Sequence, residues 1–300
     1  MRNQTLRTNS VRAYTGAMSS AEMSFSPTVR RRRLSAELIA LREQAGLTLQ
    51  QVADKLEWSR AIVANLETGR TRYPQVSHVR LLLDVYGVTD TQRHEALLDL
   101  TRQARSKGWW TKYGDVLSGG YVGFESEASG ICMYQPQVIP GLLQTRDYAA
   151  ASARAGLNSP DVVDKIVDVR MKRQEIWKRD TPPRLWAVID EAVIARGACT
   201  EMMREQIRHL VDMTKAHSTI TLQVLPFSAG PHAGLSGPFV ILDFPNLADQ
   251  AMVYLESRHD GLYLEDPQVV SDYRTVLGHV QVSALNPAES IAHLTSLIEE

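Results

Sequence analysis

The chain lacks an apolar run long enough to cross a membrane, and it does not open with the succession of charged, apolar and small residues typical of a secretory signal. It has two cysteines, Cys132 and Cys199, whose separation matches no metal-binding or redox spacing and fits a reducing compartment. The 44% apolar and 22% charged content is that of a globular protein. These features predict a cytoplasmic protein without a membrane partner.

Motifs of enzymes and cofactor-binding proteins are also missing. The run from Gly234 to Pro238 lacks the final glycine of a nucleophile elbow, and the adjacent Asp190 and Glu191 point apart. Eight histidines are scattered without the spacing of a helical metal site. We therefore expect no enzyme, no metal and no cofactor. His232, in a glycine-rich loop, is the one histidine to consider as a ligand, although a plain surface role is the commoner one.

The net charge of −1 conceals a division of the chain. Lys and Arg exceed Asp and Glu by five over residues 28–107, whereas Asp and Glu exceed Lys and Arg by eight over residues 108–300. A basic domain followed by an acidic one is typical of a nucleic-acid-binding protein with a separate regulatory body. Residues 1–27, rich in Ser, Thr, Asn and Arg, predict a disordered tail, with Met18 and Met23 as possible later starts.

The stretch from Leu47 to Gly69 predicts two short helices joined by a tight turn. Thr48 and Ser59 are suited to begin them, and Gly69 is suited to end the second. An upstream helix over about 31–45 carries an apolar stripe, and two further helices over about 76–86 and 89–105 complete an all-α domain of five. Such short helices must pack on one another, which leaves the outer face of the Ser59 helix free.

That outer face carries the chemistry of base recognition. Ala61 and Asn65 point away from the apolar side, and Ser59 and Arg60 form the amino-terminal tip. Asn can pair with adenine, Arg with guanine, and Ala can rest on a thymine methyl group. The alternative is an ordinary helical hairpin inside a larger core.

This segment resembles the helix-turn-helix of phage-repressor-like (XRE-family) regulators, whose second helix enters the major groove. The resemblance implies groove-facing positions on this helix and a closing Glu67-x-Gly69. The sequence departs from the family at Glu57, where glycine is usual, so either a left-handed Glu or a different turn is expected. The basic flanks, Arg30–Arg33 and Arg70 with Arg72, either contact phosphates or are merely solvated. The predicted DNA-contacting residues are Thr48, Gln50, Ser59, Arg60, Ala61, Ala64, Asn65, Arg70 and Arg72.

The acidic half predicts an α+β domain with an antiparallel sheet, so the whole chain is mainly α and α+β overall. The expected strands are 219–225, 239–244, 251–256 and 261–264, with a short apolar candidate at 185–189 and an extended, proline-bounded segment from Tyr134. Helices are expected near Thr145, from Ser159, over 201–216, and over the last two segments, 267–283 and 287–298.

Three stretches, 138–149, 182–194 and 223–244, look like those of an uncharacterised α+β domain that follows an XRE-type helix-turn-helix in actinobacterial regulators. Such proteins are sometimes described as antitoxin-like and often sit beside genes for small partner proteins. The resemblance implies a transcriptional regulator whose second domain senses a partner or ligand. It leaves the signal unidentified.

A sensing pocket is one interpretation of the aromatic residues in this half, and filling of the core or the domain interface is the other. The candidate ligand or partner residues are Trp109, Trp110, Tyr113, Arg146, Tyr148, Trp186 and His232. The full hypothesis is a homodimer that reads two half-sites of a pseudo-palindromic DNA operator and responds to a small protein or ligand. Its rival is an antitoxin-like interaction module that sequesters a small partner, with DNA binding secondary.

Overall fold

The computed structural model describes residues 29–105, 109–113, 116, 120–197, 199–245, 249–257 and 261–299. The expected tail, 1–27, and the expected boundary at 107 and 108 lie outside these residues. Five helices were expected in the basic part, and this is confirmed: α1 (Val29–Gln44), α2 (Leu49–Leu56), α3 (Arg60–Glu67), α4 (Val76–Val85) and α5 (Thr91–Ala104).

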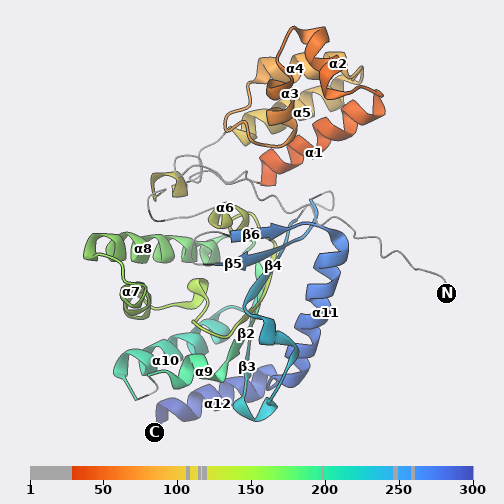
Figure 1. Cartoon of the computed structure of the whole chain (residues 1–300). Coiled ribbons are helices and arrows are strands. Elements are labelled where there is room, and N and C mark those ends of the chain that lie inside the picture. Colours follow the sequence, from red (N-terminus) through yellow and green to blue (C-terminus); the bar gives the residue numbers. More distant parts are fainter. Residues whose placement is uncertain are drawn as a thin grey trace, which may run out of the picture.

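The five helices form one bundle (Figure 1), and a single apolar core holds them together. The stripe of α1, formed by Leu34, Leu38 and Leu41, is buried against Val63 of α3 and apolar residues of the other helices. Helices α2 and α3 have eight residues each, which is too short for stability in isolation. Their shape therefore depends on this packing.

The turn between α2 and α3 contains a left-handed glutamate. Glu57 has φ 56° and ψ 35°, and the following Trp58 donates its backbone N–H to the carbonyl of Ala53 at 2.9 Å. Of the two geometries considered for this position, the left-handed residue is the one found. A side chain in this conformation costs about 1 kcal/mol relative to glycine.

The acidic part begins with the 3-10 helix η1 (Trp109–Tyr113) and continues as an α+β domain. Its helices are α6 (Tyr121–Glu125), η2 (Gly141–Leu143), α7 (Arg146–Ala155), α8 (Pro160–Arg173), η3 (Gln174–Lys178), α9 (Glu191–Ala195), α10 (Glu201–Ala216), η4 (Phe227–Ala229), η5 (Ala233–Ser236), α11 (Pro267–Ser283) and α12 (Pro287–Glu299). Its strands are β1 (Gly130–Gln135), β2 (Arg184–Asp190), β3 (Ile220–Leu225), β4 (Phe239–Asp243), β5 (Met252–Glu256) and β6 (Gly261–Leu264).

The six strands form a mixed sheet in the order β3-β2-β1-β4-β5-β6. β1, β2 and β3 are parallel to one another, whereas β4, β5 and β6 are antiparallel to their neighbours. The expectation of an antiparallel sheet was therefore wrong for half of the strands. The physical reason is connectivity, because helices separate β1 from β2 and β2 from β3, and parallel neighbours need such long crossovers. The extended segment expected from Tyr134 is strand only to Gln135.

Helices cover both faces of the sheet (Figure 1). Leu185, Ala187 and Ile189 of β2 lie in the larger core beneath α10 and α12, and Val188 lies in the core beneath α11. The central strands are thus buried on both sides, which suits their nearly continuous apolar sequence. No helix in the described part of the chain is long and apolar enough to cross a membrane.

Candidate nucleic-acid interface

The outer face of α3 is open to solvent. Arg60, Ala61 and Asn65 are exposed, Ala64 is half-buried, and Val63 on the opposite side is fully buried. Within the described residues, no hydrogen bond or ion pair engages the side chains of Arg60 and Asn65. The polar groups predicted to read bases therefore project from a helix whose apolar side is fixed.

Ile62, 38% exposed, lies among these residues and was not singled out from the sequence. An apolar side chain at this place suits a thymine methyl group in the major groove. In the sequence Ile62 is adjacent to Val63 and close to Leu66, so it is easily taken for part of the apolar stripe. Its exposure distinguishes it from Val63.

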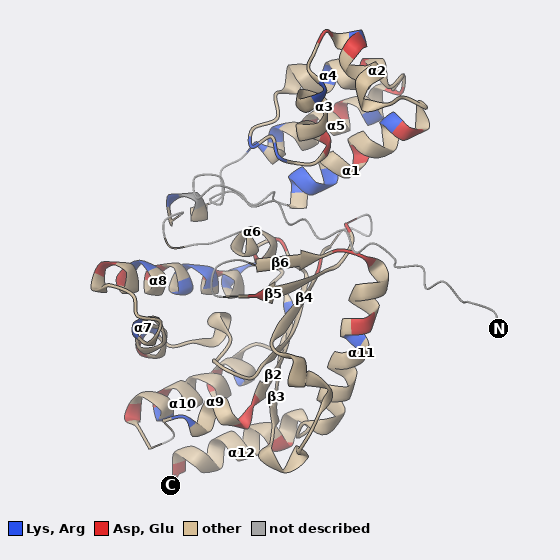
Figure 2. Cartoon of the chain, in the orientation of Figure 1, with Lys and Arg blue, Asp and Glu red and all other residues tan. Residues whose placement is uncertain are grey.

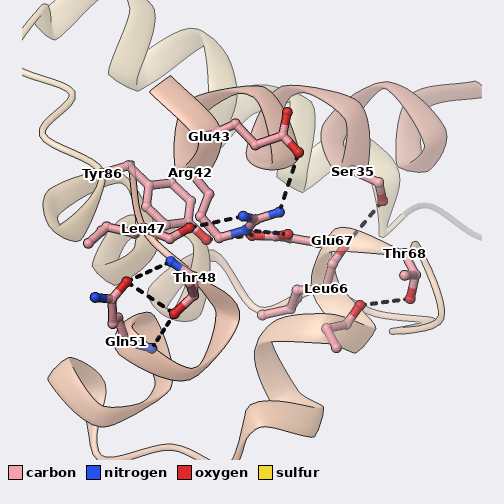
Figure 3. A network of polar contacts seen from close by, with 11 residues as sticks. Ser35, Arg42, Glu43, Leu47, Thr48, Gln51, Leu66, Glu67, Thr68 and Tyr86 are labelled. Atoms are coloured by element: carbon pink, nitrogen blue, oxygen red, sulfur yellow. Dashed lines mark hydrogen bonds and ion pairs between the residues drawn. The ribbon is translucent and has the colours of Figure 1, made fainter. Parts of the chain in front are cut away.

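A buried ion pair holds the carboxyl end of α3 (Figure 3). The Nε atom of Arg42 on α1 donates to both carboxylate oxygens of Glu67, at 2.9 and 2.8 Å, and Tyr86 donates its hydroxyl to the same carboxylate at 2.8 Å. Glu67 is 3% exposed. Burial, followed by the hydrogen bond to Glu67, raises the pKa of Tyr86 far above its usual range. Charge-assisted contacts of this kind fix orientation as well as stability.

A second contact between α1 and α3 lies two turns away from Arg42. Ser35 Oγ donates to the carbonyl of Leu66 at 3.2 Å, and Arg42 also donates to the carbonyl of Leu47 at 3.0 Å (Figure 3). The seven-residue spacing of Ser35 and Arg42 places both on one face of α1. Together they tie α3 and the start of α2 to the longest helix of this part.

The two predicted helix starts differ in their caps. Thr48 and Gln51 form a complete capping box, with the Gln51 N–H donating to Thr48 Oγ1 at 3.2 Å and Thr48 N–H donating to Gln51 Oε1 at 2.9 Å. Ser59 stands at the cap position of α3, yet in the described part its hydroxyl makes no cap hydrogen bond. Thr48 therefore caps α2, whereas the Ser59 hydroxyl is available to donate to an external acceptor. Gln50 is exposed and donates to Asp54 at 2.8 Å.

The loop after α3 carries the next two predicted contact residues, Arg70 and Arg72, both exposed. Gly69 has φ 70°, a left-handed value that favours glycine, and the Thr71 N–H donates to the carbonyl of Asn65 at 3.1 Å. These features fold the loop back along α3. The positive charges of Arg70 and Arg72 are consequently presented beside α3.

The arginine run at the start of α1 has another environment. Arg32 pairs with Glu265 of the acidic part at 3.1 Å, a partner that neither sequence alternative included, and phosphate contact by the run stays a prediction. Such a contact between distant segments could not be read from the local sequence.

The candidate ligand residues do not gather in one pocket. Trp109 lines a pocket of about 200 Å³ together with charged residues that include Lys172, Arg173 and Arg179. Trp110 packs on α6, where a Cβ at Gly123 would lie 3.0 Å from its ring. Tyr113 meets Trp109 edge-on, with 6.1 Å between ring centroids.

The remaining members of that set lie elsewhere. Tyr148 is buried in the large core and accepts a hydrogen bond from the Ile139 N–H at 3.1 Å. Arg146 is exposed and pairs with Asp168, and Trp186 on β2 donates to Gln223 at 2.8 Å. His232 accepts from the Gly234 N–H at 3.1 Å and so shapes its own loop. Among the described residues, no group of three or more potential metal ligands comes together.

Two known families match parts of the chain. Residues 33–96 match the family described as a helix-turn-helix domain, and residues 119–296 match a domain of unknown function, DUF5753. No curated protein and no solved structure matches the chain. The first match indicates DNA as a partner, and the second covers more than half of the 300 residues. The chain therefore belongs to the DUF5753 family and carries a helix-turn-helix domain ahead of the family domain.

Proposed function

We propose that the protein is a sequence-specific transcriptional regulator in which α3 enters the major groove. The observation that carries this proposal is the outward face of α3, where Arg60, Ala61 and Asn65 are exposed while Glu67 is held from behind by Arg42. A rigid helix with unengaged Arg and Asn side chains meets the geometric requirement for bidentate base contacts. Arg70 and Arg72 supply contacts to phosphates, which set the position of the helix on the duplex.

The regulator acts as a homodimer in this proposal. Each chain has a single helix-turn-helix, and its few base contacts alone would give weak and poorly selective binding. Two copies related by a two-fold axis would read inverted half-sites about 10 base pairs apart. The operator would then be pseudo-palindromic, and the protein would work in the cytoplasm, on the nucleoid.

The DUF5753 domain is proposed as a non-catalytic effector domain that responds to a small partner protein or a ligand. A rival function, sequestration of a small partner with DNA binding secondary, is supported by Phe227 and Leu235, which are 61% and 71% exposed on the connection between β3 and β4. Native mass spectrometry of the full chain purified from its own cells separates the two. A stoichiometric small protein on every copy, absent from DNA-bound material, favours sequestration.

Selection of duplexes from a random pool tests the main proposal. The purified full chain should enrich inverted repeats with half-site centres about 10 base pairs apart. The Arg60→Ala, Asn65→Ala double variant is the control and should enrich no motif. Enrichment of a motif by this variant, or of none by the wild type, contradicts the proposal.

A further inference from the structure

The first turn of α1 belongs to two domains at once. Val29, its first residue, is 5% exposed in the core that also contains Phe124 and the strands of the effector domain. Leu34, five residues later, lies in the helix-turn-helix core. Arg30 to Arg33 fill the interval, so four consecutive positive charges stand where the two domains meet (Figure 2).

Arg32 contacts the effector domain directly. Its Nε lies 3.1 Å from Glu265 Oε2, and its Nη1 donates to the carbonyl of Gln250 at 2.8 Å. The guanidinium carbon also lies 5.9 Å from the centre of the Phe244 ring. The Arg32 side chain is 15% exposed, compared with 43% for Glu265, so the pair is partly shielded from water.

Two more carboxylates are influenced by the charges of the same run. Burial raises the pKa of Glu127, and the charges of Arg30 and Arg31 oppose that rise. Burial likewise raises the pKa of Asp249, against the charges of Arg33 and Arg32. The charges of Glu127 and Asp249 thus act on the run from a distance, whereas Glu265 contacts it directly through Arg32.

The run is also connected to the proposed DNA-facing surface. Arg31 Nη1 donates to the carbonyl of Arg72 at 2.9 Å, in the loop that follows α3. A phosphate beside that loop would be close to the start of α1, where positive charge attracts it. An arginine that is paired with a carboxylate of its own chain attracts a phosphate less strongly, because the carboxylate neutralises its charge and occupies its donors.

We propose that Glu265 competes with DNA phosphates for Arg32 in the arginine run of α1, so that docking of the effector domain lowers the affinity of the protein for DNA. This inference rests on the proposed function, since it concerns the regulation of the same DNA-binding surface. Any event that draws Glu265 away would free Arg32 and strengthen binding. The effector domain would in this way control α3 without covering it.

The Glu265→Gln variant tests the competition with a minimal change of shape. Its affinity for the selected duplex, measured by fluorescence anisotropy, should rise roughly two- to fivefold, as expected for loss of a partly shielded ion pair. The dependence of log affinity on log salt concentration should also become steeper by about 0.9, the contribution of one more phosphate contact. Glu201→Gln is the matched control, because Glu201 is exposed on α10 and the change alters net charge equally.

Hydrogen exchange supplies a readout that does not depend on DNA. Backbone amides of residues 33–36, which donate to the carbonyls of the first turn of α1, should exchange faster in Glu265→Gln than in the wild type and should be unchanged in Glu201→Gln. Unchanged exchange, or an affinity that stays equal or falls in Glu265→Gln, overturns the inference while the wild type still binds its duplex selectively. A wild type that prefers no duplex sequence contradicts the proposed function itself, whatever the exchange shows.

Discussion

Arg42 of α1 and Glu67 of α3 are 25 positions apart in the sequence and in direct contact, with Arg42 Nε 2.8 Å from Glu67 Oε2. The contact lies behind the exposed face of α3 and is completed by the hydroxyl of Tyr86 (Figure 3). It links the helix that would read DNA to the helix whose first turn touches the effector domain. The orientation of α3 therefore depends on α1.

Breaking this pair should destabilise the protein strongly. Glu67→Gln removes the charge that compensates Arg42, and loss of one partner of a buried pair costs about 3 kcal/mol in the free energy of unfolding. Glu43→Gln is the control, since Glu43 lies 3.8 Å from the same arginine and is 66% exposed, and it should cost less than about 0.5 kcal/mol. Urea unfolding measures both. Similar losses in the two variants would show that the buried contact has no special weight.

The two helix starts should respond differently to alanine. Thr48→Ala removes a complete capping box and should lower the free energy of unfolding by about 1 kcal/mol. Ser59→Ala removes a hydroxyl without a cap hydrogen bond in the described part and should cost less than about 0.5 kcal/mol. Thermal unfolding checks the difference, and a larger loss for Ser59→Ala would contradict the assignment of the caps.

The pKa of Tyr86 predicts a dependence of stability on alkaline pH. Its folded pKa lies above the unfolded value near 10, so its contribution is complete below pH 10 and falls as pH rises, because the unfolded chain loses its proton first. One such group lowers the free energy of unfolding by about 1.4 kcal/mol per pH unit in that range. Urea unfolding between pH 9 and 11 should therefore show a shallower decline for Tyr86→Phe than for the wild type. An equal decline of the free energy of unfolding in the wild type and in Tyr86→Phe would contradict this prediction.

Local signals predicted much of this fold. The helix bounds of α10, α11 and the helix-turn-helix agree closely with the sequence, because caps, prolines and apolar spacing act over a few residues. The parallel half of the sheet was missed, since pairing of β1 with β2 and of β2 with β3 depends on distant segments. A sequence clue existed in the helices that separate these strands.

In the candidate site, too, local features were predicted from the sequence and long-range contacts were not. Exposure of Arg60 and Asn65 followed from helical periodicity, whereas the role of Arg42 did not, because an arginine beside an apolar stripe is usually solvated. The candidate pocket residues were grouped because they are aromatic or charged and lie in the same half of the chain. The fold places Tyr148 and Trp186 away from Trp109. Long-range packing decides such groupings.

The most direct test of the account is the affinity of the Arg60→Ala and Asn65→Ala variants for the selected duplex and for a scrambled one. Each substitution should weaken specific binding by about 1–3 kcal/mol, leave binding to the scrambled duplex nearly unchanged, and not alter the unfolding transition, because both side chains are exposed. Arg154→Ala, an exposed arginine on α7, is the control and should bind like the wild type. If both variants retain wild-type affinity and selectivity, α3 is not the helix that reads DNA.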